Sequence, residues 1–221
     1  MLNPTQTVAS LVLEHSACAR VFQTRRIDFC CRGDRSIEDA ARDRGVELPL
    51  LLEELERAIA QRSGGPPPPQ SLPEIIAYVV EHHHTYLREA LPFVQQLANK
   101  VARVHGEQNA KLSSLAYATT ELVETLLAHI EEEEKQLFAR LLATPRPDAE
   151  WIQAALAEMR EEHLEVAAIL ERIRDAADDF TLPEWACRSY RALFEELEAL
   201  ERDTFEHVHL EHHVLAPALM S

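Results

Sequence analysis

The amino-acid sequence predicts an all-α protein, in which an up-down-up-down four-helix bundle follows a small helical N-terminal domain. The 221 residues include only five glycines and few β-branched runs, a composition that favours helices. In four long segments, apolar residues recur at alternating steps of four and three, the pattern of a bundle helix with one buried seam. In the third segment this seam comprises positions 152, 156, 159, 163, 166, 170 and 173.

Residues 1–62 are expected to form a small domain of short helices. Ser36-Ile-Glu-Asp39 resembles a capping box, in which the first side chain accepts a hydrogen bond from the start of the helix. The predicted helices of this domain cover residues 4–23, 36–44 and 49–61.

A linker is predicted at residues 63–73, which read SGGPPPPQSLP. Two glycines followed by four prolines cannot continue a helix, and the prolines favour an extended, semi-stiff spacer. This segment therefore separates the small domain from a bundle at residues 74–221.

Turn and capping residues divide the bundle into its four helices. Capping boxes are predicted at 71–74 and 181–184, and the proline-containing segment 144–148 ends the second helix, with Asp148 as the N-cap of the third. The predicted helices cover residues 74–99, 112–142 and 149–176, and a fourth helix follows the second capping box and ends at Pro217.

In each bundle helix the apolar seam becomes polar for one or two positions and then returns to apolar. Two helices carry a His-x-x-x-Glu pair, and the other two carry a single histidine. Residues four apart share one face of an α-helix, so each pair can bind one metal ion. The six candidate ligands are His84, His129, Glu133, His163, His207 and Glu211.

These six positions lie at similar depth in the predicted bundle, which favours a metal centre. A buried carboxylate costs several kcal/mol without a counter-charge. Four imidazoles and two carboxylates suit two non-haem iron ions, bridged by carboxylates and an oxo or hydroxo group, better than a single zinc ion. The alternatives are a satisfied core histidine at His163 and a solvated charge run at Glu131–Glu134. Periodicity alone barely separates His83 from His84.

Cys30 and Cys31 form a dipeptide just before a predicted helix start and among four arginines. Nearby positive charge and a helix N-terminus lower the pKa of a thiol. We therefore expect a reactive pair of redox or transfer thiols. The alternative is two small buried residues in a turn. A disulfide between adjacent cysteines requires a strained ring, so no structural bridge is expected.

Composition restricts the partners and the location. A net charge of −16 argues against a nucleic-acid partner. No run of about 18 apolar residues occurs, so no membrane span is expected. The N-terminal residues lack the pattern of an export signal. We therefore expect a cytoplasmic protein whose four cysteines, including Cys18 and Cys187, are thiols.

Six motifs span nearly the whole chain and together resemble one family. They are Asp28-Phe29-Cys30-Cys31, His84-x-x-x-Arg88-x-x-Leu91-Pro92, KVARVH at 100–105, His129-x-x-x-Glu133-Glu134-x-x-Leu137-Phe138, Glu162-His163, and His207-x-x-Leu210-Glu211-x-x-Val214-Leu215-x-Pro217. In these motifs the chain resembles the repair-of-iron-centres (RIC) proteins, hemerythrin-like di-iron proteins of bacteria. Each of the family's six iron ligands has a counterpart among the six candidates. Arg32 and Ala216 depart from the family's usual glycine and phenylalanine.

The resemblance implies a hemerythrin-like bundle and the repair of iron–sulfur clusters damaged by nitric oxide or oxidative stress. Such a protein would supply iron to the clusters, remove nitric oxide reductively, or do both. The implied partners are iron–sulfur client or scaffold proteins, with nitric oxide or oxygen as small ligands, and the expected assembly is a monomer or a homodimer.

Three other functions compete with this interpretation. A hemerythrin-type oxygen or nitric oxide binding or sensing protein would usually have five histidines. A ferritin-like ferroxidase uses Glu-x-x-His rather than His-x-x-x-Glu. A metal-free signalling bundle is disfavoured by carboxylates in the seam. The Cys-Cys domain favours repair over all three.

Overall fold

A computed structural model of the chain describes residues 2–61 and 71–220. Within these residues the secondary structure is helical, with one isolated antiparallel bridge between Thr7 and Ser36 and no strand. The predicted all-α class is therefore confirmed. No helix in this part of the chain combines the length and the apolar character that a bilayer crossing requires.

The chain divides into two compact units. One unit comprises Ile76–Asp203, and the other combines Met1–Ile75 with Thr204–Ser221. The predicted linker at 63–73 lies outside the described residues over positions 63–70, and its last two residues belong to helix α5 (Leu72–Tyr78).

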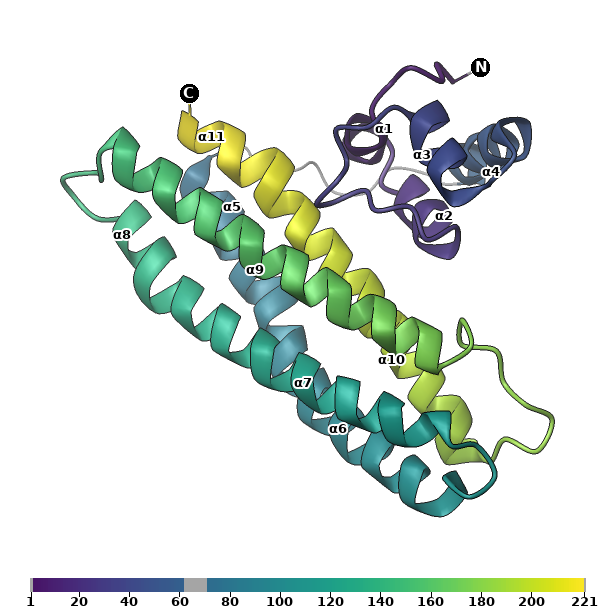
Figure 1. Cartoon of the computed structure of the whole chain (residues 1–221). Helices are drawn as coiled ribbons and strands as arrows, with labels where there is room; N and C mark the ends of the chain where they lie inside the picture. The colour runs from purple at the N-terminus through teal and green to yellow at the C-terminus, as the bar shows by residue number, and fades with distance from the viewer. Residues whose placement is uncertain (1, 62–70, 221) are drawn as a thin grey trace. The chain divides into compact units, whose positions relative to one another are not determined.

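The unit of residues 76–203 is a four-helix bundle, whose long helices lie side by side in Figure 1. Its buried residues include most of the predicted seam; in α9, for example, every seam position except the half-buried Leu156 is buried. The helical segments are η1 (Val79–His84), α6 (Thr85–His105), α7 (Lys111–Glu132), η2 (Glu133–Phe138), α8 (Ala139–Leu141), α9 (Ala149–Ala176) and the part of α10 (Arg188–Leu210) that precedes Thr204.

Polar contacts hold α10 to its neighbours in this unit. Arg174 of α9 forms a buried double hydrogen bond with Glu201, with Nε and Oε1 2.8 Å apart. Lys100 of α6 donates to the hydroxyl of Ser189 at 3.1 Å. These contacts place α10 against both α6 and α9.

The third bundle helix has the predicted bounds, but the fourth begins later than predicted. Asp148 caps α9, since its side chain accepts a hydrogen bond from the Trp151 N–H at 2.9 Å. The capping box predicted at 181–184 is wrong, because helix α10 starts only at Arg188. Residues 178–180 follow α9 in the left-handed region, with φ of 50–57°, and Thr181 donates its N–H to Asp178 instead of starting a helix.

The small domain contains four helices in its described residues, where three were predicted. The predicted helix 4–23 is wrong, because the chain leaves helical geometry at His15 (φ −140°, ψ 81°). This break lets two short helices pack against each other around one core, which a single straight helix would not permit. The helices are α1 (Val8–Glu14), α2 (Cys18–Thr24), α3 (Ile37–Arg44) and α4 (Leu48–Gln61).

The core of this unit includes Phe22, Phe29 and Leu51, and Phe205 from the second half of α10 packs against it. The rings of Phe29 and Phe205 meet edge to face, with centroids 5.9 Å apart. The predicted cap at Ser36 is confirmed, since its hydroxyl accepts the Asp39 N–H at 3.1 Å. The unit also contains η3 (Glu211–Leu215) and α11 (Ala216–Met220).

The buried Arg174–Glu201 pair generates a stability prediction. Glu201→Ala is expected to lower the free energy of unfolding by about 3 kcal/mol, because it leaves a guanidinium buried without its main counter-charge. The matched control is Glu121→Ala, which removes the partner of Arg172 in a pair whose side chains are 50% and 35% exposed. Its expected effect is below about 1 kcal/mol. Urea unfolding followed by circular dichroism measures both, and equal losses would contradict the expectation.

Candidate metal centre

All six candidate ligands are buried, although each is a polar side chain. Four of them lie in the unit of residues 76–203, and the other two lie in the unit that contains Thr204–Ser221. The first group comprises His84, His129, Glu133 and His163, and the second comprises His207 and Glu211.

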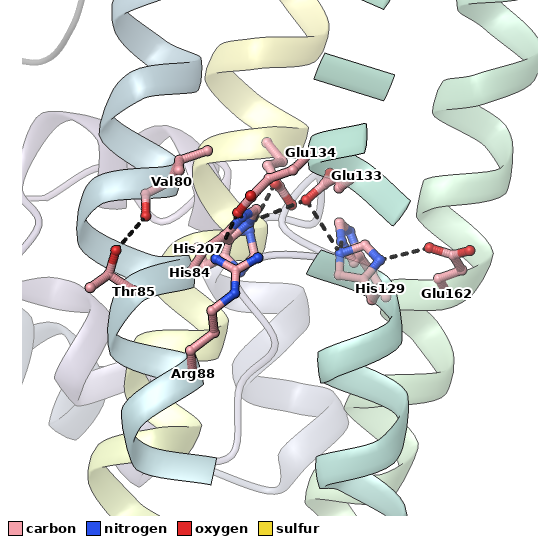
Figure 2. Close-up of polar contacts among 11 residues, drawn as sticks. Val80, His84, Thr85, Arg88, His129, Glu133, Glu134, Glu162 and His207 are labelled. Atoms are coloured by element: carbon pink, nitrogen blue, oxygen red, sulfur yellow. Dashed lines mark hydrogen bonds and ion pairs between the residues drawn. The ribbon is translucent and has the colours of Figure 1, made fainter. Parts of the chain in front are cut away.

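Glu133 is the centre of the first group. Its side chain is 3% exposed, and its Oε2 lies 3.4 Å from Nε2 of His84 and 3.6 Å from Nε2 of His129. The Nε2 atoms of His129 and His163 are 3.1 Å apart. Three helices of the bundle thus bring three imidazoles and one carboxylate together, and Figure 2 shows His84 and His129 on either side of Glu133.

Two further glutamates orient these histidines. The Nδ1 atoms of His84 and His129 lie 2.8 Å from Glu134 Oε1 and 2.7 Å from Glu162 Oε2, respectively (Figure 2). A carboxylate accepts a hydrogen bond from Nδ1–H, so in neutral imidazoles the Nε2 lone pairs face Glu133. Metal-binding histidines are usually held in this way.

Arg88 stabilises one of these orienting carboxylates. Its Nη1 donates to Glu134 Oε1 at 2.8 Å. Partial burial raises the pKa of Glu134, but hydrogen bonds from Arg88 and His84 outweigh it, so the pKa lies below its ordinary value. Glu134 therefore remains an anion at neutral pH. The sequence contains these residues beside the candidate ligands, but their orienting role depends on contacts that periodicity does not predict.

The second group is a single pair. Nε2 of His207 lies 2.8 Å from Oε1 of Glu211, and both side chains are almost fully buried. The two residues are four apart along one helix, as the sequence indicated.

Three helices change to π-helical pitch where the candidate ligands occur. His84 ends η1, Glu133 begins η2 and Glu211 begins η3. In η1 both the backbone N–H and the hydroxyl of Thr85 bond to the carbonyl of Val80, five residues earlier (Figure 2). Short π segments within α-helices are frequent at functional sites. The periodicity of the sequence predicts α-helical geometry throughout and does not indicate these segments.

The donor set fits a transition-metal ion such as iron. Imidazole nitrogens and carboxylate oxygens together suit iron, copper and zinc. A buried carboxylate needs a counter-charge, which a divalent ion among these nitrogens and oxygens would supply.

Cys30 and Cys31 lie in a buried turn around Asp28. The Asp28 carboxylate accepts the N–H groups of Cys30 at 3.0 Å and Cys31 at 2.8 Å, and it lies 3.2 Å from the Cys30 sulfur. Burial raises the pKa of Cys30 well above its ordinary value, and the neighbouring Cys31 and Asp28 raise it further. For Cys30, the expectation of a depressed pKa is therefore wrong.

Two of the nearby arginines have carboxylate partners of their own. Arg25 pairs with Glu54 and Arg35 pairs with Asp43, so their charges are compensated within the domain. The sequence shows how many positive charges lie nearby, whereas the thiol pKa depends on burial and on where each charge is directed.

Three histidines outside the six candidate ligands form hydrogen bonds that connect this turn to the C-terminal helix. Ring nitrogens of His212 and His213 lie 3.3 Å and 2.9 Å from the carbonyl oxygen of Cys30, and His209 Nδ1 lies 3.1 Å from that of Phe29. A Cβ at Gly33 would lie 3.1 Å from Nε2 of His213 and 2.6 Å from Ala9 Cβ, so a larger residue would crowd both neighbours. The cysteine turn is thus bound to the helical segment that carries the His207–Glu211 pair.

The fold and the buried histidines and glutamates define the class of protein. Residues 75–219 match the family described as the hemerythrin HHE cation binding domain, and the chain belongs to this family. Residues 4–59 match a second family, ScdA_N, described as a domain of unknown function.

Three similar proteins have names that state a function. The chain is 28% identical to the iron-sulfur cluster repair protein ScdA of Staphylococcus haemolyticus, over 97% of this chain and 98% of that protein. It is 29% identical to the iron-sulfur cluster repair protein YtfE of Yersinia pseudotuberculosis and to that of Musicola paradisiaca, in each case over 96% of this chain and 95% of the relative. The resemblance to the repair-of-iron-centres proteins is thereby confirmed.

The buried carboxylate at the centre generates the second prediction. Glu133→Leu should leave the metal-free bundle as stable as the parent or up to about 2 kcal/mol more stable, because it replaces a buried charge by an apolar side chain in an apolar seam. It should also reduce the bound metal. The matched control, Glu132→Leu, changes an exposed neighbour and should alter neither property. Urea unfolding of chelator-treated protein and metal analysis measure the two effects, and a destabilised metal-free Glu133→Leu protein would contradict the expectation.

Proposed function

We propose that this protein repairs iron–sulfur clusters damaged by nitric oxide or oxidative stress, using two iron ions bound by the six candidate ligands. The observation that carries the metal assignment is the placement of Glu133 between two imidazoles whose other nitrogens are held by carboxylates. The relatives named as iron-sulfur cluster repair proteins support the repair function.

The proposed ligand set comprises His84, His129, Glu133, His163, His207 and Glu211. When bound, the iron would supply metal for cluster repair and a position for a small ligand such as nitric oxide or oxygen. The protein's own contribution is to hold the lone pairs of His84 and His129 towards Glu133. Glu134 and Glu162 do this by accepting hydrogen bonds from the Nδ1–H groups.

The Cys30–Cys31 turn is proposed to serve transfer or redox coupling rather than iron storage. Its carbonyl groups bind His209, His212 and His213, so it is attached to the helix that carries two of the proposed ligands. The proposed partners are iron–sulfur client or scaffold proteins, and the proposed location is the cytoplasm.

The orienting glutamates generate a prediction about iron affinity. Glu162→Gln should weaken iron binding by about 10–100-fold, because the neutral amide holds the Nδ1–H of His129 less strongly than a carboxylate does. Glu161→Gln is the matched control, since it makes the same change at an exposed neighbour. Competition with a chelator measures the affinity, with the parent expected to bind about two irons per chain. Equal affinities of the two variants would refute the orienting role.

Repair itself is tested with an iron–sulfur dehydratase inactivated by nitric oxide. The iron-loaded parent should restore dehydratase activity, and Glu133→Leu should not. The double variant Cys30→Ser/Cys31→Ser should keep its iron yet restore activity more slowly. A parent that binds oxygen or nitric oxide but restores nothing would favour the binding or sensing alternative.

Cys18→Ser is the control for the cysteine variant, because it changes another buried thiol of the same domain. It should retain repair. Loss of repair in Cys18→Ser would assign the double variant's defect to a weakened domain, and loss of iron in the double variant would make a thiol a ligand.

A further inference from the structure

A cysteine and a histidine meet at the end of the bundle formed by the C-terminus of α6 and the N-terminus of α10. Cys187 directly precedes α10, and its sulfur lies 3.1 Å from Nε2 of His105, the last residue of α6. His105 is 21 residues beyond His84, which is about 30 Å along a helix. The pair is therefore separate from the candidate metal centre.

A third side chain orients the imidazole. Nδ1 of His105 lies 3.2 Å from Oε1 of Gln108, an acceptor, so Nδ1 carries a proton and donates a hydrogen bond to that oxygen. Nε2 is then the atom that exchanges a proton with the thiol. A nucleophile, a base within hydrogen-bonding distance and a group that orients the base are the arrangement found where cysteine is activated.

Helix α10 also favours the thiolate. The backbone N–H of Tyr190 is the largest influence lowering the pKa of Cys187 below its ordinary value, and the hydrogen bond from His105 and the N–H of Ser189 add to it. The hydrogen bond with Cys187, followed by that with Gln108, raises the pKa of His105. The two shifts agree in favouring a thiolate beside an imidazolium.

The charged groups nearby have other partners. Lys100 of α6 binds the hydroxyl of Ser189, and Asp178 pairs with Lys111. The imidazole of His105 lies within hydrogen-bonding distance of the thiol.

The sulfur is open to solvent and lies beside an aromatic surface. Cys187 is exposed, and Trp185, 45% exposed, has its ring 5.6 Å from that of His105. The structure describes all four cysteines, and the other three are buried. Burial raises the pKa of Cys18 to about 11, and that of Cys30 is raised as well. Reactivity is thus favoured at Cys187, which the sequence did not single out.

We propose that Cys187 is a surface site for thiol–disulfide exchange with low-molecular-weight disulfides, activated by His105. The thiolate attacks one sulfur of the disulfide, a new S–S bond forms, and the original S–S bond breaks. The departing thiolate takes the proton from His105 Nε2. The product is a mixed disulfide on Cys187 and one free small thiol, so no other oxidant is required.

Glutathione disulfide and iodoacetamide are suitable probes for the full-length protein. Peptide mass mapping after brief exposure at pH 7 should show the mixed disulfide on Cys187 before any other cysteine. Iodoacetamide should alkylate Cys187 with a half-maximal rate at lower pH than for glutathione in the same buffer. Primary reaction at Cys30 or Cys31, or a pH profile like that of glutathione, would overturn the proposal.

Variants separate the role of His105 from simple exposure. His105→Gln should slow exchange at pH 7 on the order of tenfold and shift the alkylation profile to higher pH. His15→Gln removes an imidazole elsewhere and should change neither. An unchanged rate and profile in a folded His105→Gln protein would overturn the activation by His105. Because the pair is remote from the metal ligands, the iron content of both variants should equal that of the parent.

Discussion

The burial of the Glu133 carboxylate between two imidazoles is the constraint on which the rest of the site depends. A carboxylate that is 3% exposed is tolerated only with compensating positive charge or hydrogen-bond donors. In neutral imidazoles the Nε2 atoms that face Glu133 carry lone pairs, because Glu134 and Glu162 accept hydrogen bonds from the Nδ1–H groups. A metal cation between Glu133 and these nitrogens would supply the compensating charge. Further charged groups surround the carboxylate, and Arg88 extends that shell to the surface.

The apolar seam on either side makes this arrangement possible. Leu126 and Leu137 flank the His129–Glu133 pair in sequence, and both are buried. The large apolar area elsewhere in the bundle offsets the cost of the polar layer. The change to π-helical pitch at Glu133 is also local. It changes the direction of side chains over one turn, while the helix continues on either side. The apolar seam therefore supplies stability, and the polar layer supplies the candidate metal ligands.

The sequence predicted most of the fold because periodicity and capping are local signals. Helix α9 begins after the Asp148 cap and keeps its predicted bounds. The errors occur where tertiary packing outweighs local preference: the predicted helix 4–23 breaks at His15 to surround one core, and α10 starts at Arg188 instead of at the capping box. The candidate ligands followed from the interrupted seam, whereas the π segments and the orienting glutamates depend on contacts between helices. No periodic pattern contains that information.

The cysteines show why residue type and neighbouring charge do not determine chemistry. Cys30 lies among arginines in the sequence, but its buried thiol stays protonated at neutral pH. Cys187 has no arginine-rich motif before it, yet a helix N-terminus and His105 favour its thiolate at the surface. A protonated, buried thiol resists small electrophiles from solvent and becomes a ligand when a metal ion displaces its proton. For Cys30, the proposed transfer role therefore requires proton release at the moment of transfer, whereas at Cys187 the lowered pKa makes proton release easier.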